Sequence, residues 1–232
     1  MSSKIPRHIA VIPDGNRRWA KQEGVNYTKA YAAGGAATHV IIEEAFRSGV
    51  ECLTFWAASE DNLTKRPVAE TKILLALIRR ELANILKNDS IIKHKVRVRV
   101  FGRFRELLKD TKVNELVREL ESRTKHFSDH NLTVLLGYDG KREMVEAIKV
   151  IQRNQLKPSN EAVEASLWTH ELPPVDLVIR TGGEPHSSAG FMMWLTANSE
   201  LYFTNLFWPS FTAKEFHRAL LDYETRRRMH GA

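Results

Sequence analysis

The sequence predicts a single α/β domain whose mostly parallel central β-sheet is flanked by helices. Two observations lead to this fold class: strand-like and helix-like segments alternate along the chain, and most of the strand-like segments are short apolar runs. This alternation is typical of a parallel sheet with helices on both faces. The 232 residues contain no repeat, low-complexity segment or long linker, so residues 1–232 are assigned to one domain.

Six segments are expected to form strands. Most are continuous apolar runs, which indicate strands buried on both faces of the sheet. One differs, because its apolar residues alternate with basic ones, and this period of two places it near an edge of the sheet. The alternating strand covers residues 95–101, and the others cover residues 9–12, 51–57, 132–136, 175–180 and 200–203.

Helices are expected between these strands. An amphipathic helix over residues 67–86 carries Leu74, Leu77 and Ile78 on one face, and a short helix begins after Ser159, whose hydroxyl can cap it. The polar stretch 58–66 is expected to be a loop, and it is the segment expected to move. The remaining helices are expected over residues 28–47, 105–126, 141–152 and 213–227.

The composition limits the classes of function. A formal net charge of +7 favours anionic partners, but the bases are scattered and the chain has no nucleic-acid motif or zinc-ligand spacing. We therefore expect no nucleic-acid partner. Cys52, the single cysteine, lies in an apolar run and is expected to be packed, so no intrachain disulfide forms. No apolar run approaches the roughly 20 residues of a membrane span, and the first residues lack a signal-peptide core.

The first polar cluster follows the first expected strand. Asp14, Gly15, Asn16, Arg17 and Arg18 come directly after an apolar run. Ligand sites of α/β proteins lie at the carboxyl edge of the sheet, and a carboxylate with two guanidinium groups there suits a metal and a polyanion. The alternative is a strand–turn–helix corner with solvated arginines.

A second cluster repeats this order after residues 175–180. Arg180 ends the strand, Gly182 and Gly183 allow a ligand to approach the backbone closely, and Ser188 adds a donor. A guanidinium fork matches phosphate oxygens, so this cluster also suits a phosphate. The alternative is a Gly-Gly turn with a surface arginine.

Two further features carry polar side chains next to regular structure. Asn62 and Arg66 lie in the polar stretch before Pro67, where they serve a ligand or simply cap and solvate the loop. Glu200 leads an apolar strand, where a carboxylate needs a base or a metal as its partner. Together with Asp14 it suits Mg²⁺, which prefers few carboxylates plus phosphate oxygens and water.

These clusters resemble the motifs of the cis-prenyltransferases, the undecaprenyl diphosphate synthase-like family. Five motifs match in family order, at near-family spacing, from about Arg7 to the C-terminus. The Asp-Asp-x-x-Asp signature of the trans-prenyltransferases is absent from the chain. The resemblance implies a homodimer whose parallel sheet borders a hydrophobic tunnel, and it implies dependence on Mg²⁺. The matching segments are His8 with residues 14–20, Ser59 with Asn62 and residues 66–67, residues 137–143, residues 176–184, and residues 199–204 with residues 208–209.

The resemblance also implies a reaction that joins an allylic diphosphate to isopentenyl diphosphate with a new cis double bond. Asp14 would bind Mg²⁺ and assist departure of the allylic diphosphate, and Glu200 would complete the metal site. Asn62 is the family's proposed proton acceptor, but an amide is a weak base and a diphosphate oxygen is the alternative. The implied contacts of the allylic diphosphate and the neighbouring loop are Gly15, Asn16, Arg17, Arg18, Trp19, Ser59, Glu60, Asp61 and Arg66. Those of isopentenyl diphosphate are Arg180, His186 and Ser188.

The chain departs from the family pattern at several of these positions. Tyr27 and Tyr31 stand where many members carry arginine and histidine, so they can donate hydrogen bonds to phosphate but carry no charge. Leu63 replaces a common tryptophan, and His186, which replaces an arginine, could bind diphosphate or the metal. The C-terminal Arg-x-Gly of many members appears as residues 229–231, with Arg226, Arg227 and Arg228 just upstream to fill its role.

Several functions stay open at this point. The chain is a catalytic cis-prenyltransferase, an irregular enzyme that couples two allylic diphosphates head to middle, a short-chain synthase, or a non-catalytic subunit of a heteromeric enzyme. Retention of residues 14–16 favours the catalytic enzyme. Ala57 and Ala58, beside the expected tunnel mouth, favour a medium to long, undecaprenyl-like product. We expect a cytoplasmic protein that contacts a membrane surface only transiently, to release this product.

Overall fold

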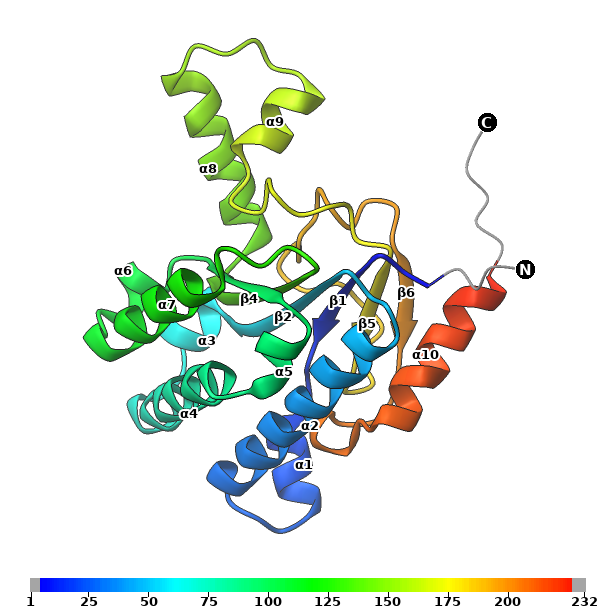
Figure 1. The fold of residues 1–232 in the computed structure, drawn as a ribbon. Coiled ribbons are helices and arrows are strands. Elements are labelled where there is room, and N and C mark those ends of the chain that lie inside the picture. The colour runs from blue at the N-terminus through cyan, green and yellow to red at the C-terminus, as the bar shows by residue number, and fades with distance from the viewer. Residues whose placement is uncertain (1–4, 227–232) are drawn as a thin grey trace.

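The central sheet has six strands, and every neighbouring pair is parallel, as the alternation of segments predicted (Figure 1). The computed structural model describes residues 5–226, except for the side chain of Val68. The strand order is β3-β4-β2-β1-β5-β6, so the strand with alternating residues does lie at an edge. The strands are β1 (His8–Ile12), β2 (Cys52–Ser59), β3 (Val96–Phe101), β4 (His130–Tyr138), β5 (Leu177–Arg180) and β6 (Glu200–Phe203).

One predicted helix is wrong in its extent. Residues 105–126 form two helices instead of one, because Lys109 adopts a φ of 49° and Asp110 caps the second helix. The Asp110 carboxylate accepts a hydrogen bond from the Val113 amide at 3.0 Å, and such a cap begins a new helix. The helices are α1 (Asn16–Gln22), α2 (Tyr27–Arg47), α3 (Glu60–Thr64), α4 (Val68–Leu86), α5 (Asp89–Lys93), α6 (Phe104–Leu108), α7 (Thr111–Thr124), α8 (Gly140–Arg153), α9 (Asn160–Ser166), η1 (Trp208–Ser210) and α10 (Ala213–Thr225).

The polar stretch 58–66, expected to be a loop, is mostly regular. Its first two residues end β2, and the next five form α3. The Asn62 amide donates to Ser59 Oγ at 3.0 Å, and Asn62 Oδ1 accepts from the Ser59 amide at 3.4 Å. This reciprocal capping box explains why a helix begins here, and it fixes two predicted site residues at the end of β2.

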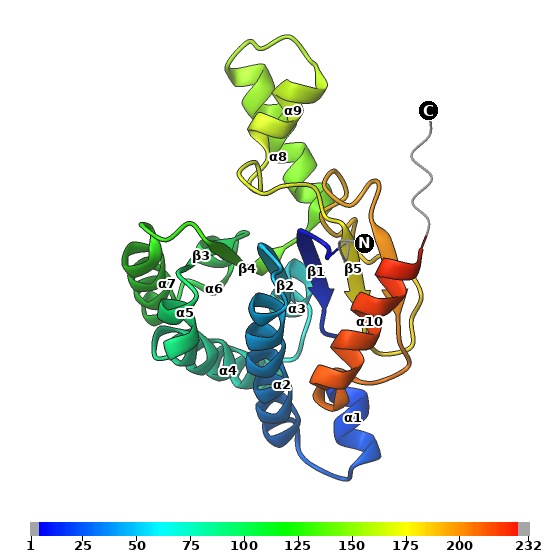
Figure 2. The same ribbon diagram turned by 45° about the vertical axis from the view of Figure 1, so that its right-hand side comes forward.

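The two faces of the sheet are covered differently. Helices α2, α4, α7 and α10 cover one face, with Ile41, Leu74 and Phe216 among the buried side chains (Figure 1). The other face is covered mainly by the irregular segments on either side of β5, and the one between β5 and β6 contributes Phe191 and Leu195. Helices α8 and α9 extend away from the sheet (Figures 1 and 2). The expectation of helices on both faces therefore holds fully for one face only.

The chain crosses to the other half of the sheet at β1. Strand β2 pairs with one side of β1 and β5 with the other, so the segments that leave their carboxyl ends diverge. Such a switch point leaves a crevice at the edge of the sheet where α/β proteins bind ligands. Residues 13–18, 60–66 and 181–190 follow β1, β2 and β5, so three polar clusters meet at this crevice.

Two smaller expectations were also tested. Cys52 is buried and free, and burial raises the pKa of its thiol to about 11, so it is a packed residue as predicted. Within residues 5–226, no helix is long and apolar enough to cross a membrane.

Candidate active site

A polar cavity of about 690 Å³ opens at the carboxyl edge of the sheet. Its walls come from four strand ends and the segments that follow them, so the cavity gathers residues that are far apart in the sequence. The predicted site residues in its lining are Asp14, Gly15, Asn16, Arg17, Arg18, Tyr31, Ser59, Asp61, Asn62, Arg66, Arg180 and Ser188.

Asp14 is fixed at the start of this cavity by its backbone and its side chain. Its carbonyl oxygen accepts hydrogen bonds from Thr181 Oγ1 at 2.7 Å and from the Trp208 amide at 3.0 Å. Its Oδ1 accepts one from the Gly15 amide at 2.6 Å. The carboxylate nevertheless remains about one third exposed toward the cavity. Asp14 is therefore preorganised at an open position, which suits contact with a ligand.

Two arginines and two carboxylates form a closed network around Asp14. Arg18 contacts Asp14 at 3.1 Å and Glu184 at 3.0 Å, and Arg180 contacts the same two carboxylates at 3.2 and 3.1 Å. Gly182 approaches Arg18 so closely that an added Cβ would lie 2.7 Å from Nη2, and its φ of 96° also favours glycine. The network balances two positive against two negative charges, so an incoming anion can take over the arginine donors.

Arg180 is the more rigid of the two bases. Its side chain is 3% exposed, whereas that of Arg18 is 40% exposed. Arg180 Nη1 donates to the His186 carbonyl and to Ser188 Oγ, both at 2.6 Å. Its buried Nε has no hydrogen-bond partner among the described residues. Arg180 is thus a fixed donor with unused capacity, while Arg18 has room to move toward a ligand.

Asn16 and Arg66 also line the cavity. Asn16 Nδ2 donates to the Pro13 carbonyl at 3.3 Å, but its buried Oδ1 has no partner among residues 5–226. Arg66 Nη1 donates to the Tyr31 hydroxyl at 2.8 Å. Tyr31 therefore holds a base at the cavity without itself adding charge.

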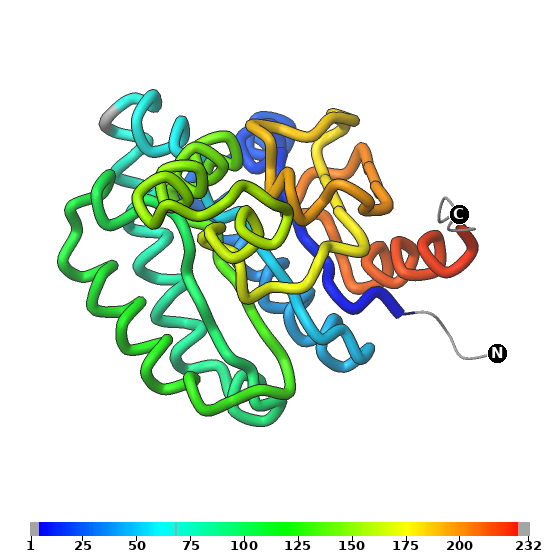
Figure 3. Tube along the Cα trace, turned by 90° about the horizontal axis from the view of Figure 1, so that it is seen from above, coloured from blue at the N-terminus to red at the C-terminus, as the bar shows by residue number. Residues whose placement is uncertain are grey.

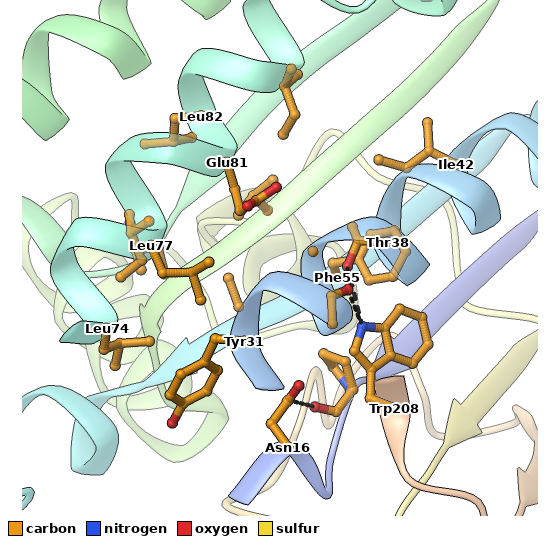
Figure 4. A pocket seen from close by; sticks show the side chains of 18 of the residues that line it. Asn16, Tyr31, Thr38, Ile42, Phe55, Leu74, Leu77, Glu81, Leu82 and Trp208 are labelled. Carbon is orange, nitrogen blue, oxygen red and sulfur yellow. Dashed lines mark hydrogen bonds between the residues drawn. The ribbon is translucent and has the colours of Figure 1, made fainter. Parts of the chain in front are cut away.

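An apolar pocket of about 140 Å³ adjoins the polar cavity between α2, α4 and the sheet (Figure 4). Its lining includes Leu77, Phe55 and Trp208, and the Trp208 indole donates to the Gly34 carbonyl at 2.8 Å. Five of the described residues line both spaces, so the two adjoin one another. These shared residues are Pro13, Asn16, Tyr31, Ala57 and Leu74. The combined site suits a molecule with an anionic head and an apolar tail.

Some predicted site residues do not line either space. Leu63 packs into the main core, and Glu60 pairs with Arg103 at 3.3 Å. Trp19 donates to Ser210 Oγ at 3.0 Å, and Tyr27 is an exposed residue at the start of α2. The His186 ring is exposed and lies 3.2 Å from Ser188 Oγ. Their assignment to the site stays a prediction.

Within one chain, Glu200 and Asp14 lie at opposite ends of the strands of the sheet. In the β5–β6 pairing Glu200 is opposite Leu177, at the amino ends of both strands, whereas Asp14 follows the carboxyl end of β1. Glu200 pairs with Arg226 at 2.9 Å, where α10 ends on the same side of the molecule as β1 begins (Figure 3). One chain therefore does not bring Asp14 and Glu200 together. Residues 227–232, which include the remaining C-terminal arginines, lie outside the described residues.

The structure adds residues that the sequence prediction left out of the site. Glu184 completes the charge network, Asp139 caps α8 and lines the polar cavity, and Trp208 walls the apolar pocket. Glu184 and Asp139 each follow a strand end within one of the family motifs, and this position could have indicated that they belong to the site. Ala58 is 2% exposed in the core, so only Ala57 lies at the mouth.

The carboxylates of the site determine whether it can hold a metal ion. Among the described residues, no group of three His, Cys, Asp or Glu side chains is close enough together to hold a metal ion. Asp14 is the predicted metal ligand that faces the polar cavity. Mg²⁺ commonly binds through one or two carboxylates plus phosphate oxygens and water, so this donor set fits Mg²⁺ brought together with a diphosphate.

Comparison with known proteins identifies the family. A family model described as "Putative undecaprenyl diphosphate synthase" matches residues 12–231. The chain belongs to the undecaprenyl diphosphate synthase family. It is 39% identical to the isoprenyl transferase of Aquifex aeolicus over 100% of this chain and 98% of that protein. It is 34% identical, over 97% of this chain and 90% of the relative, to the ditrans,polycis-undecaprenyl-diphosphate synthase ((2E,6E)-farnesyl-diphosphate specific) of Salmonella typhi. The protein is therefore a cis-prenyltransferase, as its motifs implied.

A solved structure supports the same fold. Lavandulyl diphosphate synthase from Lavandula x intermedia, in complex with dimethylallyl diphosphate, superposes with a TM-score of 0.87 and 25% sequence identity. The match covers 97% of both chains. The predicted fold of the cis-prenyltransferases is thus confirmed for this family member.

Proposed function

We propose that this cis-prenyltransferase joins an allylic diphosphate to isopentenyl diphosphate in an Mg²⁺-dependent reaction. The observation that carries the proposal is that a polar cavity lined by arginines adjoins an apolar pocket. An allylic diphosphate has the matching form, because its head is anionic and its tail is a hydrocarbon. Burial of the tail would contribute about 0.8 kcal/mol per CH₂, so the tail supplies affinity and the head supplies orientation.

The allylic diphosphate is assigned to the side of the cavity that contains Asp14. Arg18 has room to turn from Glu184 toward the leaving group, and the Asn16 and Gly15 backbone lies beside it. Diphosphate is a poor leaving group until positive charge offsets it, so preorganised donors lower the barrier electrostatically. Mg²⁺ bound through Asp14 would supply further positive charge to the diphosphate oxygens.

Isopentenyl diphosphate is assigned to Arg180 and Ser188. The guanidinium of Arg180 is buried and held by four contacts, so its position is already set when phosphate oxygens replace some of these acceptors. His186 is a candidate additional donor, because its ring lies 3.2 Å from Ser188 Oγ. The proton lost on forming the double bond goes to Asn62 or to a diphosphate oxygen. The capping bond from Ser59 already occupies Asn62 Oδ1, which favours the diphosphate oxygen.

Other features of the enzyme follow from its resemblance to the family. We propose a cytoplasmic homodimer, with Glu200 available to a metal site only if a second chain brings it there. Transient membrane contact during product release stays a prediction. The undecaprenyl-like length of the product also stays a prediction.

A product assay tests the proposed function. Purified protein, Mg²⁺, labelled isopentenyl diphosphate and farnesyl or geranyl diphosphate should give cis-polyprenyl diphosphates that chromatography can size. Chelation of Mg²⁺ should abolish incorporation. Product from dimethylallyl diphosphate alone would instead identify irregular coupling of two allylic diphosphates. This is a specific second candidate, because His186 stands where many family members carry an arginine in the isopentenyl diphosphate site. No incorporation by folded protein would point to a required partner subunit.

A further inference from the structure

A single carboxylate interrupts the apolar pocket. Glu81, on α4, is the one acidic residue in the lining among residues 5–226, with neighbours that include Leu77, Ile78 and Leu82. Figure 4 shows its side chain reaching from α4 across the lining toward α2. A hydrocarbon tail gains nothing from a carboxylate, so the position of Glu81 calls for an explanation.

Contacts from both helices hold the carboxylate in place. His39 Nε2, on α2, lies 3.1 Å from Oε2, and Arg80 Nε donates to Oε1 at 2.9 Å. Asn84 Nδ2 donates to Oε2 at 3.4 Å. Gly35 lies directly across from the carboxylate, since a Cβ at that position would be 2.6 Å from Oε1. The absence of a side chain at Gly35 therefore leaves the carboxylate the space that it occupies against α2.

The surroundings of Glu81 keep it ionised. Burial raises the pKa of its carboxyl, but the hydrogen bonds and charges of His39 and Arg80 outweigh burial and the pKa is lowered. Glu81 therefore carries a negative charge at neutral pH. A charged carboxylate loses much more on removal from water than a neutral polar group does.

Glu81 lies well inside the pocket. Leu74, on the same helix, lines both the polar cavity and the apolar pocket and thus marks their border. Glu81 follows Leu74 by seven positions, which is two turns or about 10 Å along the helix axis. A tail attached to a diphosphate in the polar cavity meets only apolar side chains of α4 at first, and it reaches the carboxylate once it has grown past these two turns.

We propose that Glu81 limits the length of the product, because further growth of the chain must strip water from its carboxylate. This inference rests on the proposed function, since it assigns the apolar pocket to the tail of the allylic substrate. It favours a shorter product than the undecaprenyl-like chain expected from the small residues at the mouth. Ile42 and Ile85, which also line the pocket, would be reached fully only when this charge is removed.

A purely structural role for Glu81 predicts something different. An ion pair between α2 and α4 would stabilise the fold, and its loss would lower the melting temperature without changing which tail lengths bind. The two roles can therefore be separated by a readout that depends on tail length.

The test compares binding of geranyl, farnesyl and geranylgeranyl diphosphates, with Mg²⁺, to the wild type, Glu81→Leu and Glu81→Gln by calorimetry. Glu81→Gln keeps the shape of the side chain and serves if Glu81→Leu does not fold. Glu115→Leu, on the exposed face of α7, is the matched control. We expect affinity in the wild type to level off or fall at the longer tails. In Glu81→Leu each added isoprene unit should strengthen binding at least about tenfold, with Glu81→Gln intermediate and Glu115→Leu like the wild type.

The outcomes separate this inference from the proposed function. A parallel dependence on tail length in the wild type and both Glu81 variants would overturn the role of Glu81. Binding of all three diphosphates without turnover on addition of isopentenyl diphosphate would overturn the proposed reaction but leave the length dependence measurable. Where turnover occurs, the products of Glu81→Leu should be longer than those of the wild type. Failure of any allylic diphosphate to bind would overturn both.

Discussion

The polar cavity and the apolar pocket share five residues at their border, yet they are built in opposite ways. The polar cavity is formed by contiguous clusters that follow strand ends, and its charged groups hold one another in a balanced network. The apolar pocket is formed by single residues from α2, α4 and the faces of β2 and β4, with Trp208 closing one side. The polar cavity thus determines where a ligand head binds, and the apolar pocket determines which tail fits.

This difference predicts different consequences of mutation. A change in the polar cavity removes charge where the reaction needs it, so the rate should fall for every substrate. A change in the apolar pocket alters how much of a tail is buried, so the rate of the first condensation should change little while product length changes. If a mutation in the polar cavity changed only product length, or one in the apolar pocket changed only the rate, the two spaces would not have these separate roles.

The largest expected effect is that of Asp14→Ala. Turnover should fall by a factor on the order of 10²–10³, because the carboxylate lies at the centre of the charge network and would hold Mg²⁺. Glu184 still pairs with both arginines, so the melting temperature should stay close to that of the wild type. Steady-state kinetics and thermal unfolding test this. Asp129→Ala, which removes an exposed carboxylate 3.6 Å from Lys95, is the control. Turnover of Asp14→Ala within a few-fold of the wild type would remove Asp14 from the reaction.

A third polar region, under the amino end of β1, differs from both spaces because it is closed to water. His8 is fully buried, with Nδ1 2.8 Å from the Pro173 carbonyl and Nε2 2.8 Å from Thr54 Oγ1. A carbonyl can only accept, so Nδ1 carries the proton and Nε2 accepts from the hydroxyl. Burial lowers the pKa of His8 from 6.5 to about 4, so the folded state favours the neutral ring.

This burial makes stability depend on pH. Between pH 6.5 and about 4 the unfolded chain binds a proton at His8 that the folded chain excludes. His8 should therefore lower the free energy of unfolding progressively as the pH falls through this window, by up to about 3 kcal/mol. At pH values above the window His8 should have no such effect. Denaturant unfolding of the wild type and His8→Gln at several pH values measures this. An equally steep fall in His8→Gln would assign the acid sensitivity to other groups.

A smaller effect is expected from Arg180→Lys. Lysine keeps the positive charge but cannot reach Asp14, Glu184, Ser188 and the His186 carbonyl at once. The kcat/KM for isopentenyl diphosphate should fall about tenfold to a hundredfold, with a smaller change in the KM of the allylic substrate. Arg218→Lys, at an exposed ion pair, is the control. A larger loss for the allylic substrate would reverse the assignment of the two diphosphates.

The sequence predicted the polar cavity far better than the apolar pocket for a physical reason. A parallel sheet aligns the carboxyl ends of its strands, so clusters such as residues 14–18 and Arg180 could be brought together from strand order alone. A tunnel wall depends on which helix faces the sheet and how closely it packs. The carboxylate of Glu81 therefore could not be distinguished from any other charged residue on an amphipathic helix until its neighbours Gly35 and His39 were known.

The errors in the fold have local causes of the same kind. The prediction of a single helix over residues 105–126 did not consider that Asp110 can cap a helix, and Asp110 begins a second helix there. The loop expected over residues 58–66 overlooked the capping box of Ser59 and Asn62. The expected pairing of Asp14 with Glu200 does not form within one chain, because the β5–β6 register puts Glu200 at the opposite end of the sheet, and a shared metal site stays a prediction.

The smallest effect on the first step, and the clearest separation of the two spaces, should come from Ala57→Leu. Ala57 lines both the cavity and the pocket, so a larger side chain there narrows the passage between them without touching the charge network. Incorporation of the first isopentenyl unit should stay within about twofold of the wild type, because the head still binds and short tails still fit. The product distribution should shift to shorter chains, since a longer tail must pass the added methyl groups. Chromatography of the products, with Ala165→Leu on the exposed side of α9 as the control, measures this. An unchanged distribution would mean that the growing tail leaves the polar cavity by another route, and the apolar pocket would then lose its assigned role.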